Sequence, residues 1–445
     1  KYLDELKEAE LLYEKLAKSL SQERNSSRWW TTLKHVLGKA DDSSYPPLKN
    51  NNDYVTDNKD KAELFNAFFI SNSNIDTSEA RLPDFSYLTD HRLDEISATE
   101  QEVLDLLKSL KVNKSTGHDG IGPKLLFESA PAIVSSLTRL INLSLTTSKV
   151  PDDWKKAQVI PIFKKNARDD PNNYRPISIL PTVSKIAERI VFKHVYNYFH
   201  EHSLLTRNQS CVPGDSTVNQ LAFLYNHFCH AIDEKKDIQI VFCDIKKAFE
   251  KVWFKGLLFK LKQLGISGTL LYWFDDYLHG RYQRVGIKGQ NSEWTLVPAG
   301  VPQGSVLGPL LFLVYIGDLV ENIHCNIKLY ADDTTLYITT DDLEEGSATL
   351  NADLVTINNW ADQWLVTFCP NKTVYMHMSL KKNKEQAPPV TFNGRQLNEI
   401  QHHKHLGVTL SNKLTWSEHV TNLSKAVGKS LDAMKKLKHS LDNNL

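Results

Sequence analysis

The sequence predicts an α+β fold in which helices accompany a small antiparallel sheet. Apolar residues recur at helical spacing in 103–110, 133–141 and 183–191. Short apolar runs at 238–243, 327–330 and 334–338 are instead typical of buried strands. The last two flank the polar tripeptide 331–333, which indicates a β-hairpin.

Other segments complete this pattern in chain order. Thr99 and Glu102 form the sequence signature of a capping box, which opens the helix over 103–110. Before it we expect a helix over 1–16, a polar linker over 41–60, a short helix over 62–70 and a second polar stretch to about residue 97. After it we expect strands at 157–163, 374–378 and 405–410, and a basic helix over 417–438.

Composition is that of an ordinary globular protein. The 445 residues are 41% hydrophobic and 24% charged, with no net charge, so the overall charge favours no class of partner. The five cysteines are scattered and form no C-x-x-C pair, which suits a reducing, intracellular compartment and gives no zinc spacing. The most apolar uncharged stretch, 305–317, is too short to span a bilayer, so no membrane partner is predicted. Because the chain starts at Lys1, we interpret it as part of a longer polypeptide.

One acidic pair differs from the others. Asp-Asp occurs six times in the sequence, and a solvated turn explains most of these pairs. Only Asp332-Asp333 lies between two strand-like runs, and Asp244 ends an apolar strand. Carboxylates from one strand and an adjacent hairpin suit two divalent ions about 3.5–4 Å apart, as phosphoryl transfer to a hydroxyl requires. The solvated turn remains the alternative for this pair.

Several segments match a known family in order. Residues 242–249 (Phe-Cys-Asp-Ile-Lys-Lys-Ala-Phe), 300–309 (Gly-Val-Pro-Gln-Gly-Ser-Val-Leu-Gly-Pro) and 330–333 (Tyr-Ala-Asp-Asp) resemble the central motifs of reverse transcriptases. Residues 114–121, 173–178, 360–373 and 406–408 resemble their flanking motifs. The chain resembles the polymerase region of non-LTR (LINE-like) retrotransposons, nearest to jockey-type elements, from about residue 61 to 420.

The resemblance implies a right-hand polymerase fold. It places an N-terminal helical extension and linker at 1–95, fingers at 96–235, a palm with a small antiparallel sheet at 236–412 and the start of a thumb at 413–445. It implies an RNA-directed DNA polymerase that adds deoxynucleotides to a primer 3′-hydroxyl. The partners are then an RNA template, a DNA primer and dNTPs, with two Mg²⁺ ions or Mn²⁺ in their place. Nuclear action follows from the same resemblance.

Catalytic roles are implied residue by residue. Asp244 and Asp332 match the metal ligands, and Asp333 matches a supporting carboxylate near the primer end that also faces the metals. Lys372 matches a lysine that protonates the leaving pyrophosphate, with an ordinary surface lysine as the alternative.

Substrate-binding roles are implied in the same way. Arg175 matches the finger arginine that grips the triphosphate, since a guanidinium donates to phosphate in pairs. Lys165, or Lys164 beside it, would assist, unless the two form only a solvated basic turn. Phe249 occupies the position of the ring that excludes a ribose 2′-hydroxyl, with core packing as the alternative. Gln303 and Gly304 lie where the backbone of the family meets the base pair.

Two further clusters allow a functional and a plain interpretation. The histidines of 402–405 could bind a metal, although a strand leading into the turn at Leu406 explains them more simply. The lysines of the last helix could follow the template-primer backbone or could simply solvate the helix. These lysines are Lys429, Lys435, Lys436 and Lys438.

This sequence also departs from the family pattern. The loop 209–217 is one residue short, with Cys211 in place of Gly-Phe, and Glu250, Cys369 and His405 replace the usual Asp, Asn and Tyr. The alternative function is therefore a decayed retrotransposon relic that folds and binds RNA without polymerising. A viral RNA polymerase is disfavoured by Phe249, and a group II intron maturase carries a further domain after the thumb.

Overall fold

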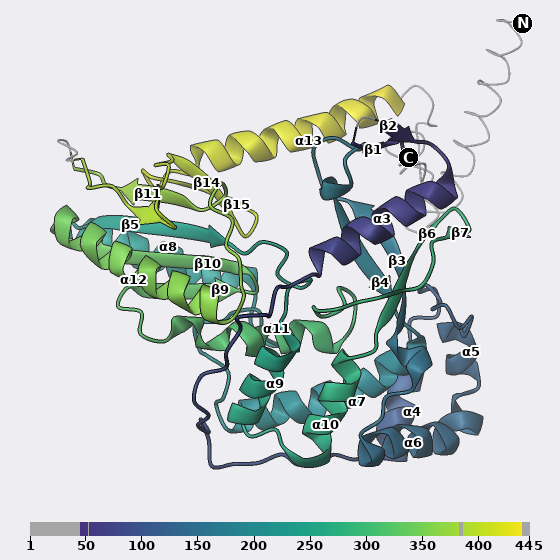
Figure 1. Cartoon of the computed structure of the whole chain (residues 1–445). Coiled ribbons are helices and arrows are strands. Elements are labelled where there is room, and N and C mark those ends of the chain that lie inside the picture. Colours follow the sequence, from purple (N-terminus) through teal and green to yellow (C-terminus); the bar gives the residue numbers. More distant parts are fainter. Residues whose placement is uncertain (1–44, 52, 382–385, 438–445) are drawn as a thin grey trace, which may run out of the picture. The chain divides into compact units, whose positions relative to one another are not determined.

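The computed structural model describes residues 45–51, 53–381 and 386–437 (Figure 1). The chain divides into two compact units. The larger unit covers 46–401, and the described part of the smaller unit is Tyr45 with 402–437. The helix expected over 1–16 lies outside the described residues.

The larger unit contains most of the regular elements. Its α-helices are α3 (Asn58–Asn72), α4 (Glu100–Lys108), α5 (Pro123–Glu128), α6 (Ala130–Thr147), α7 (Thr182–Glu201), α8 (Thr217–Asp233), α9 (Phe254–Gln263), α10 (Gly268–Leu278), α11 (Leu307–Ile316) and α12 (Leu343–Gln363). Short 3₁₀ helices are η1 (Asp152–Lys155), η2 (Pro171–Asn173) and η3 (Gly317–Val320). Its strands are β1 (Leu48–Asn50), β2 (Asp53–Val55), β3 (Lys156–Phe163), β4 (Tyr174–Ile179), β5 (Asp237–Asp244), β6 (Tyr282–Ile287), β7 (Gln290–Asn291), β8 (Thr295–Leu296), β9 (Asn326–Tyr330), β10 (Asp333–Thr340), β11 (Val374–Met378), β12 (Thr391–Phe392) and β13 (Arg395–Gln396).

A four-stranded antiparallel sheet, here called the central sheet, has the order β11-β5-β10-β9. Strand β5 is buried along nearly its whole length because helices cover both faces. On one face, Gln239 of β5 donates to Ser347 of α12. On the other face, Tyr337 of β10 packs edge-on against Phe228 of α8. The strands expected at 238–243, 327–330, 334–338 and 374–378 are confirmed.

A second sheet has the order β4-β3-β6-β7, with β8 also paired to β6. Strand β3 pairs with β4 in antiparallel fashion and with β6 in parallel fashion. The resemblance places the boundary between fingers and palm at residue 236. The second sheet contains strands from both sides of that boundary, since β3 and β4 precede it and β6 to β8 follow it. The chain as a whole is a mixed α and β protein with small, mainly antiparallel sheets, as the sequence predicted.

Most of the helices predicted from local sequence patterns are present in the structure. The capping box is present, since Thr99 Oγ1 accepts from the Glu102 amide at 3.2 Å and Glu102 Oε2 accepts from the Thr99 amide at 3.1 Å. The helices expected at 62–70, 133–141 and 183–191 are the cores of α3, α6 and α7. Within the described residues, every helix is too short or too polar to cross a membrane.

Two expectations are wrong. The single strand predicted over 405–410 is a hairpin of β14 (His402–His405) and β15 (Val408–Ser411), because Leu406 and Gly407 adopt positive φ values of 46° and 93° and reverse the chain. The polar stretch 41–60 is only partly a linker, because β1 and β2 form a small hairpin inside it and α3 already begins at Asn58. The last described element of the smaller unit is α13 (Ser417–Leu437), which confirms the predicted last helix as far as residue 437.

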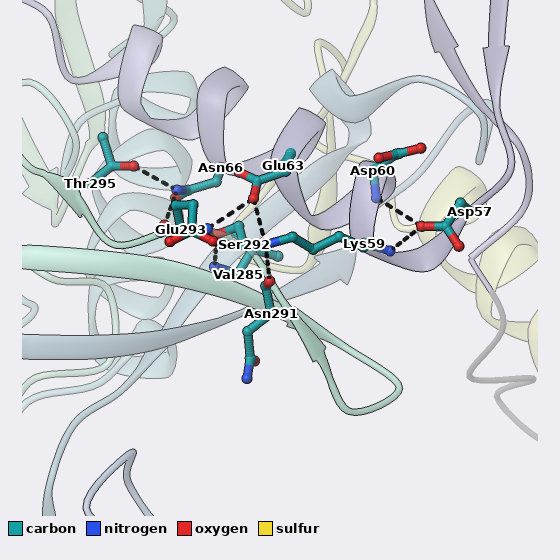
Figure 2. A network of polar contacts seen from close by, with 10 residues as sticks. All are labelled: Asp57, Lys59, Asp60, Glu63, Asn66, Val285, Asn291, Ser292, Glu293 and Thr295. Atoms are coloured by element: carbon teal, nitrogen blue, oxygen red, sulfur yellow. Dashed lines mark hydrogen bonds and ion pairs between the residues drawn. The ribbon is translucent and has the colours of Figure 1, made fainter.

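Helix α3 is attached to the second sheet by a polar network (Figure 2). Asn66 is 2% exposed and donates to the Glu293 carbonyl and to Thr295 Oγ1, both at 3.0 Å. Its side-chain oxygen accepts from Gln283 of β6 at 3.1 Å. At the helix surface, Lys59 makes exposed ion pairs with Glu63 and Glu293. The buried amide therefore fixes where α3 meets the sheet.

We expect Asn66→Ala to lower the free energy of unfolding by about 2 kcal/mol, because it leaves buried donors and acceptors unpaired. Urea denaturation followed by circular dichroism measures the change. Lys59→Ala is the control on the same helix. It removes two exposed ion pairs and one hydrogen bond to the Asn291 carbonyl, and it should lower stability by less than about 1 kcal/mol. Equal effects of the two substitutions would contradict this account.

Candidate active site

The three predicted carboxylates lie together at one end of the central sheet. Asp333 of β10 is the register partner of Asp244 of β5, and it closes the turn opposite Tyr330 of β9. Directly opposed residues carry their side chains on the same face with Cβ atoms about 4.5–5.5 Å apart. Asp332 occupies the turn immediately before. Folding thus assembles a cluster from residues far apart in the sequence.

The turn that presents Asp332 is strained. Tyr330 and Asp333 pair across a two-residue turn, in which Ala331 has a φ of 51°. A left-handed conformation costs an L-residue about 1–2 kcal/mol, so surrounding contacts must hold it. The Ala331 amide donates to Gln209 Oε1 at 3.0 Å. A side chain from outside the hairpin therefore supports this turn.

Charge repulsion is concentrated at the cluster. Burial raises the pKa of Asp333 to about 6, and the nearby carboxylates of Asp332 and Asp244 add to this effect. Burial also raises the pKa of Asp332, again with a contribution from Asp244. Lys164 and Lys372 oppose the rise at Asp333. The cluster is therefore a site where a bound cation would relieve unfavourable charge.

Lys372 contacts this cluster directly. Its Nζ donates to Asp244 Oδ2 at 2.7 Å. Partial burial acts to lower the pKa of Lys372, but the hydrogen bond and charge of Asp244 outweigh it and hold that pKa above its usual value. The lysine is accordingly charged at neutral pH and lies beside Asp244, a predicted metal ligand.

The second sheet brings two further cations toward the carboxylates. Arg175 of β4 lies opposite Ile162 of β3, so alternation places Lys164 on the same face as Arg175. Both positive charges oppose the rise in the pKa of Asp332 that burial causes. Lys165 follows in a bend beyond the end of β3. Of the two lysines considered from sequence, Lys164 is the one whose charge acts on the cluster.

The segment after Asp244 is covered by the loop 300–304. The Val301 amide donates to the Phe249 carbonyl at 2.8 Å. Gly300 has a φ of 89°, and a Cβ there would lie 2.6 Å from the Glu250 carbonyl oxygen. The half-buried ring of Phe249 stacks on Phe312 of α11, with centroids 5.1 Å apart. Phe249 thus combines core packing on one side with partial exposure.

The loop then contacts β4. The Ser178 amide donates to the Gln303 carbonyl at 2.8 Å, and a Cβ on Gly304, whose φ is 127°, would lie 2.5 Å from the Ser178 carbonyl oxygen. Glycine is therefore required at 304 by the close approach of two backbones. Within the described part of the chain, the side-chain oxygen of Gln303 has no hydrogen-bond partner and remains able to accept one.

Two residues that support the site, Glu188 and Gln209, were not predicted from the sequence. Glu188 of α7 is 1% exposed and accepts from the Val306 and Leu307 amides at 2.6 and 3.2 Å, which fixes the start of α11. Burial raises the pKa of Glu188, so its position is energetically costly unless the loop satisfies it. A glutamate within an apolar helical stripe was the available signal. Gln209 gave no signal beyond its place in the short loop.

The carboxylates can hold a cation with help from substrate. Among the described residues, no three His, Cys, Asp or Glu side chains converge closely enough to enclose an ion by themselves. Mg²⁺ is usually bound by one or two carboxylates, with water and substrate phosphates filling the other positions. The arrangement of Asp244, Asp332 and Asp333 fits that kind of open site.

Comparison with known proteins identifies the family of the chain. The family described as reverse transcriptase (RNA-dependent DNA polymerase) matches residues 162–410, more than half of the chain, so the chain belongs to this family. The matched region contains all four strands of the central sheet and all three carboxylates.

The relatives are encoded by mobile elements. The chain is 31% identical over 330 residues to a probable RNA-directed DNA polymerase from transposon BS of Drosophila melanogaster, covering 72% of this chain and 36% of that protein. It is 30% identical over 340 residues to the RNA-directed DNA polymerase from mobile element jockey of the same species, covering 74% and 37%. A probable RNA-directed DNA polymerase from transposon X-element is 29% identical over 332 residues, covering 72% and 36%. The chain spans little more than a third of these curated relatives, and the resemblance predicted from its motifs is confirmed.

The carboxylate repulsion predicts a pH-dependent effect of Asp333→Asn on the metal-free protein. A raised pKa in the folded state adds stability at low pH, and this is lost as pH rises from about 4 through about 6. At pH 7.5 the neutral asparagine of Asp333→Asn should therefore make the fold about 1 kcal/mol more stable than wild type. The gain is this small because solvent partly screens the repulsion at residue 333.

Thermal unfolding in EDTA at pH 7.5 and pH 4.0 measures this difference. The stabilisation should be present at pH 7.5 and should disappear at pH 4.0. A variant that is less stable than wild type at both pH values would show that Asp333 is held by favourable contacts instead.

Proposed function

We propose that this chain is the catalytic core of an RNA-directed DNA polymerase that copies the RNA of a mobile element. It adds deoxynucleotides to a primer 3′-hydroxyl by metal-assisted phosphoryl transfer. The observation that carries the proposal is the pairing of Asp244 with Asp333, next to Asp332 in a fixed turn. This cluster lies within the segment that matches the family.

The two sheets support a right-hand arrangement. We assign the central sheet to the palm because it carries the three carboxylates. We assign the second sheet to the fingers because it carries Arg175 and meets the loop of Gln303 and Gly304. The fingers would then comprise 96–235 together with 282–296, since β6 and β8 belong to the second sheet. Residues 1–95 form the N-terminal extension, and 413–445 begin the thumb.

Each charged group has a defined part in the proposed reaction. Mg²⁺ held at this site would supply the positive charge that makes the attacking hydroxyl more acidic and that neutralises the triphosphate. Asp244 and Asp332 would hold these ions, with Asp333 supporting the primer end. Arg175 and Lys164, on one face of the second sheet, would bind phosphate oxygens. Lys372, charged and hydrogen-bonded to Asp244, would donate a proton to the departing pyrophosphate.

A decayed copy that folds and binds RNA without polymerising is the alternative. The loop 209–217, which is one residue short, favours it. However, the start of this loop remains attached to β9, since the Leu329 amide donates to the Asn208 carbonyl at 2.8 Å and the Ser210 amide donates to the Leu329 carbonyl at 2.9 Å. The shortened loop thus keeps its contact with the carboxylate-bearing hairpin, which supports retained activity.

Extension of oligo(dT) on poly(rA) with dTTP and Mg²⁺ tests the enzyme directly. We expect wild type to extend the primer and Asp332→Asn to lose at least about 100-fold in rate, because a metal ligand is removed while the side-chain volume is kept. Asp341→Asn, in a turn away from the cluster, is the matched control and should be fully active. Lack of extension by folded wild-type protein would favour the decayed relic.

Sugar selection tests the role of Phe249. We expect Phe249→Val to raise the incorporation of UTP relative to dTTP by at least about 10-fold, because a smaller side chain leaves room for the 2′-hydroxyl. This rise corresponds to a loss of about 1.4 kcal/mol in discrimination between the two sugars. Phe312→Leu is the control, since it removes the same ring stacking from the opposite side. Unchanged selectivity in Phe249→Val would mean that this ring serves only the core.

A further inference from the structure

Gln209 makes two hydrogen bonds that join the short loop to the carboxylate hairpin. Its side chain is 5% exposed, and its Oε1 accepts from the Ala331 amide and from the Cys211 amide, both at 3.0 Å. A reversed amide would set Nε2 against two donors, so only this orientation is compatible with its neighbours. One buried oxygen therefore binds both the loop and the turn.

The bond to Ala331 acts at the most constrained point of the hairpin. Ala331 holds a φ of 51°, and the next residue is Asp332. On the preceding strand, Leu329 is bonded on both sides to the backbone of 208–210. Backbone pairing thus fixes β9, whereas the turn itself is held to the loop through the side chain of Gln209.

We propose that Gln209 is a positioning residue that holds Asp332 and Asp333 in the geometry needed to bind divalent cations beside Asp244. This inference rests on the proposed function, because it assigns that function's metal ligands to these carboxylates. Without the Gln209 acceptor, the Ala331 amide loses its partner and the strained turn can relax. Because Asp244 and Asp333 stay paired in the sheet and repel Asp332, relaxation of the turn would move Asp332 away from them and weaken the joint hold of the three carboxylates on a cation.

Two roles of Gln209 predict different results: it could set the conformation of the turn that carries Asp332, or it could only anchor the loop 209–217. A residue that only anchored the loop would affect folding or template binding and leave cation affinity unchanged. A residue that sets the turn must alter cation affinity even in the absence of nucleic acid. Groups that orient metal ligands typically contribute about 10–100-fold to metal affinity or activity.

Two substitutions at Gln209 separate these cases. Gln209→Met keeps the length of the side chain and removes the acceptor, whereas Gln209→Glu keeps an acceptor for both amides. Gln220→Met on α8 is the matched control, because Gln220 is 2% exposed and its side chain makes no hydrogen bond within the described residues. Thermal unfolding establishes that each variant is folded.

The first measurement is Mn²⁺ binding to the protein alone, followed by electron paramagnetic resonance. We expect Gln209→Met to bind Mn²⁺ about 10-fold more weakly than wild type, and Gln209→Glu and Gln220→Met to bind at least as tightly. Primer extension should show a matching rise in the Mg²⁺ concentration for half-maximal rate, with the KM for dTTP within about 2-fold.

Unchanged Mn²⁺ affinity in folded Gln209→Met, or an equal loss in Gln220→Met, would overturn the inference. Failure of wild type to extend a primer would instead reject the proposed function, while the Mn²⁺ comparison would still decide whether Gln209 positions the carboxylates. If wild type extends the primer and Gln209→Met extends it at the same rate at every Mg²⁺ concentration, the positioning role of Gln209 is rejected while the proposed function stands.

Discussion

The antiparallel pairing of β5 with β10 is the constraint on which the candidate active site depends. Its register sets Asp244 opposite Asp333. A slip of one residue would send one carboxylate to the opposite face of the sheet, because side chains alternate along a strand. Burial of β5 between α8 and α12 prevents such a slip, since it would also invert the apolar residues that both helices cover. Core packing thus determines the position of the charged cluster.

The cluster itself opposes folding. Two half-buried carboxylates with raised pKa values, and a third close by, are unfavourable in the absence of a cation. The turn adds backbone strain at Ala331. Nearby groups offset part of this cost, notably Lys372 on Asp244 and Gln209 on the turn. Such a balance is common where a protein keeps a binding geometry ready before its ligand arrives.

The sequence predicted local features well where a single physical signal dominated. The Thr99–Glu102 capping box and the apolar periodicity of α6 and α7 depend only on neighbouring residues, so they were found without the structure. Prediction failed where backbone conformation was decisive. The sequence indicated a turn at Leu406 and also a strand over 405–410. The positive φ values of Leu406 and Gly407 show that the turn divides this stretch between two strands.

The sequence by itself determined the family, the order of its motifs and the identity of the three carboxylates, because these depend on residue type and spacing. Only the tertiary structure decided which groups meet. The fold brings the charge of Lys164 to Asp332 and Asp333, and close backbone packing makes glycine necessary at 304. The supporting bonds from Glu188 and Gln209 also became visible only in three dimensions. Each of these bonds joins a side chain to a backbone amide of a segment about 120 residues further along the chain, and a linear sequence carries no record of such contacts. The sequence thus identifies the hairpin of Asp332 and Asp333, whereas its conformation and electrostatic environment depend on residues such as Gln209 and Lys164 that the fold brings close to it.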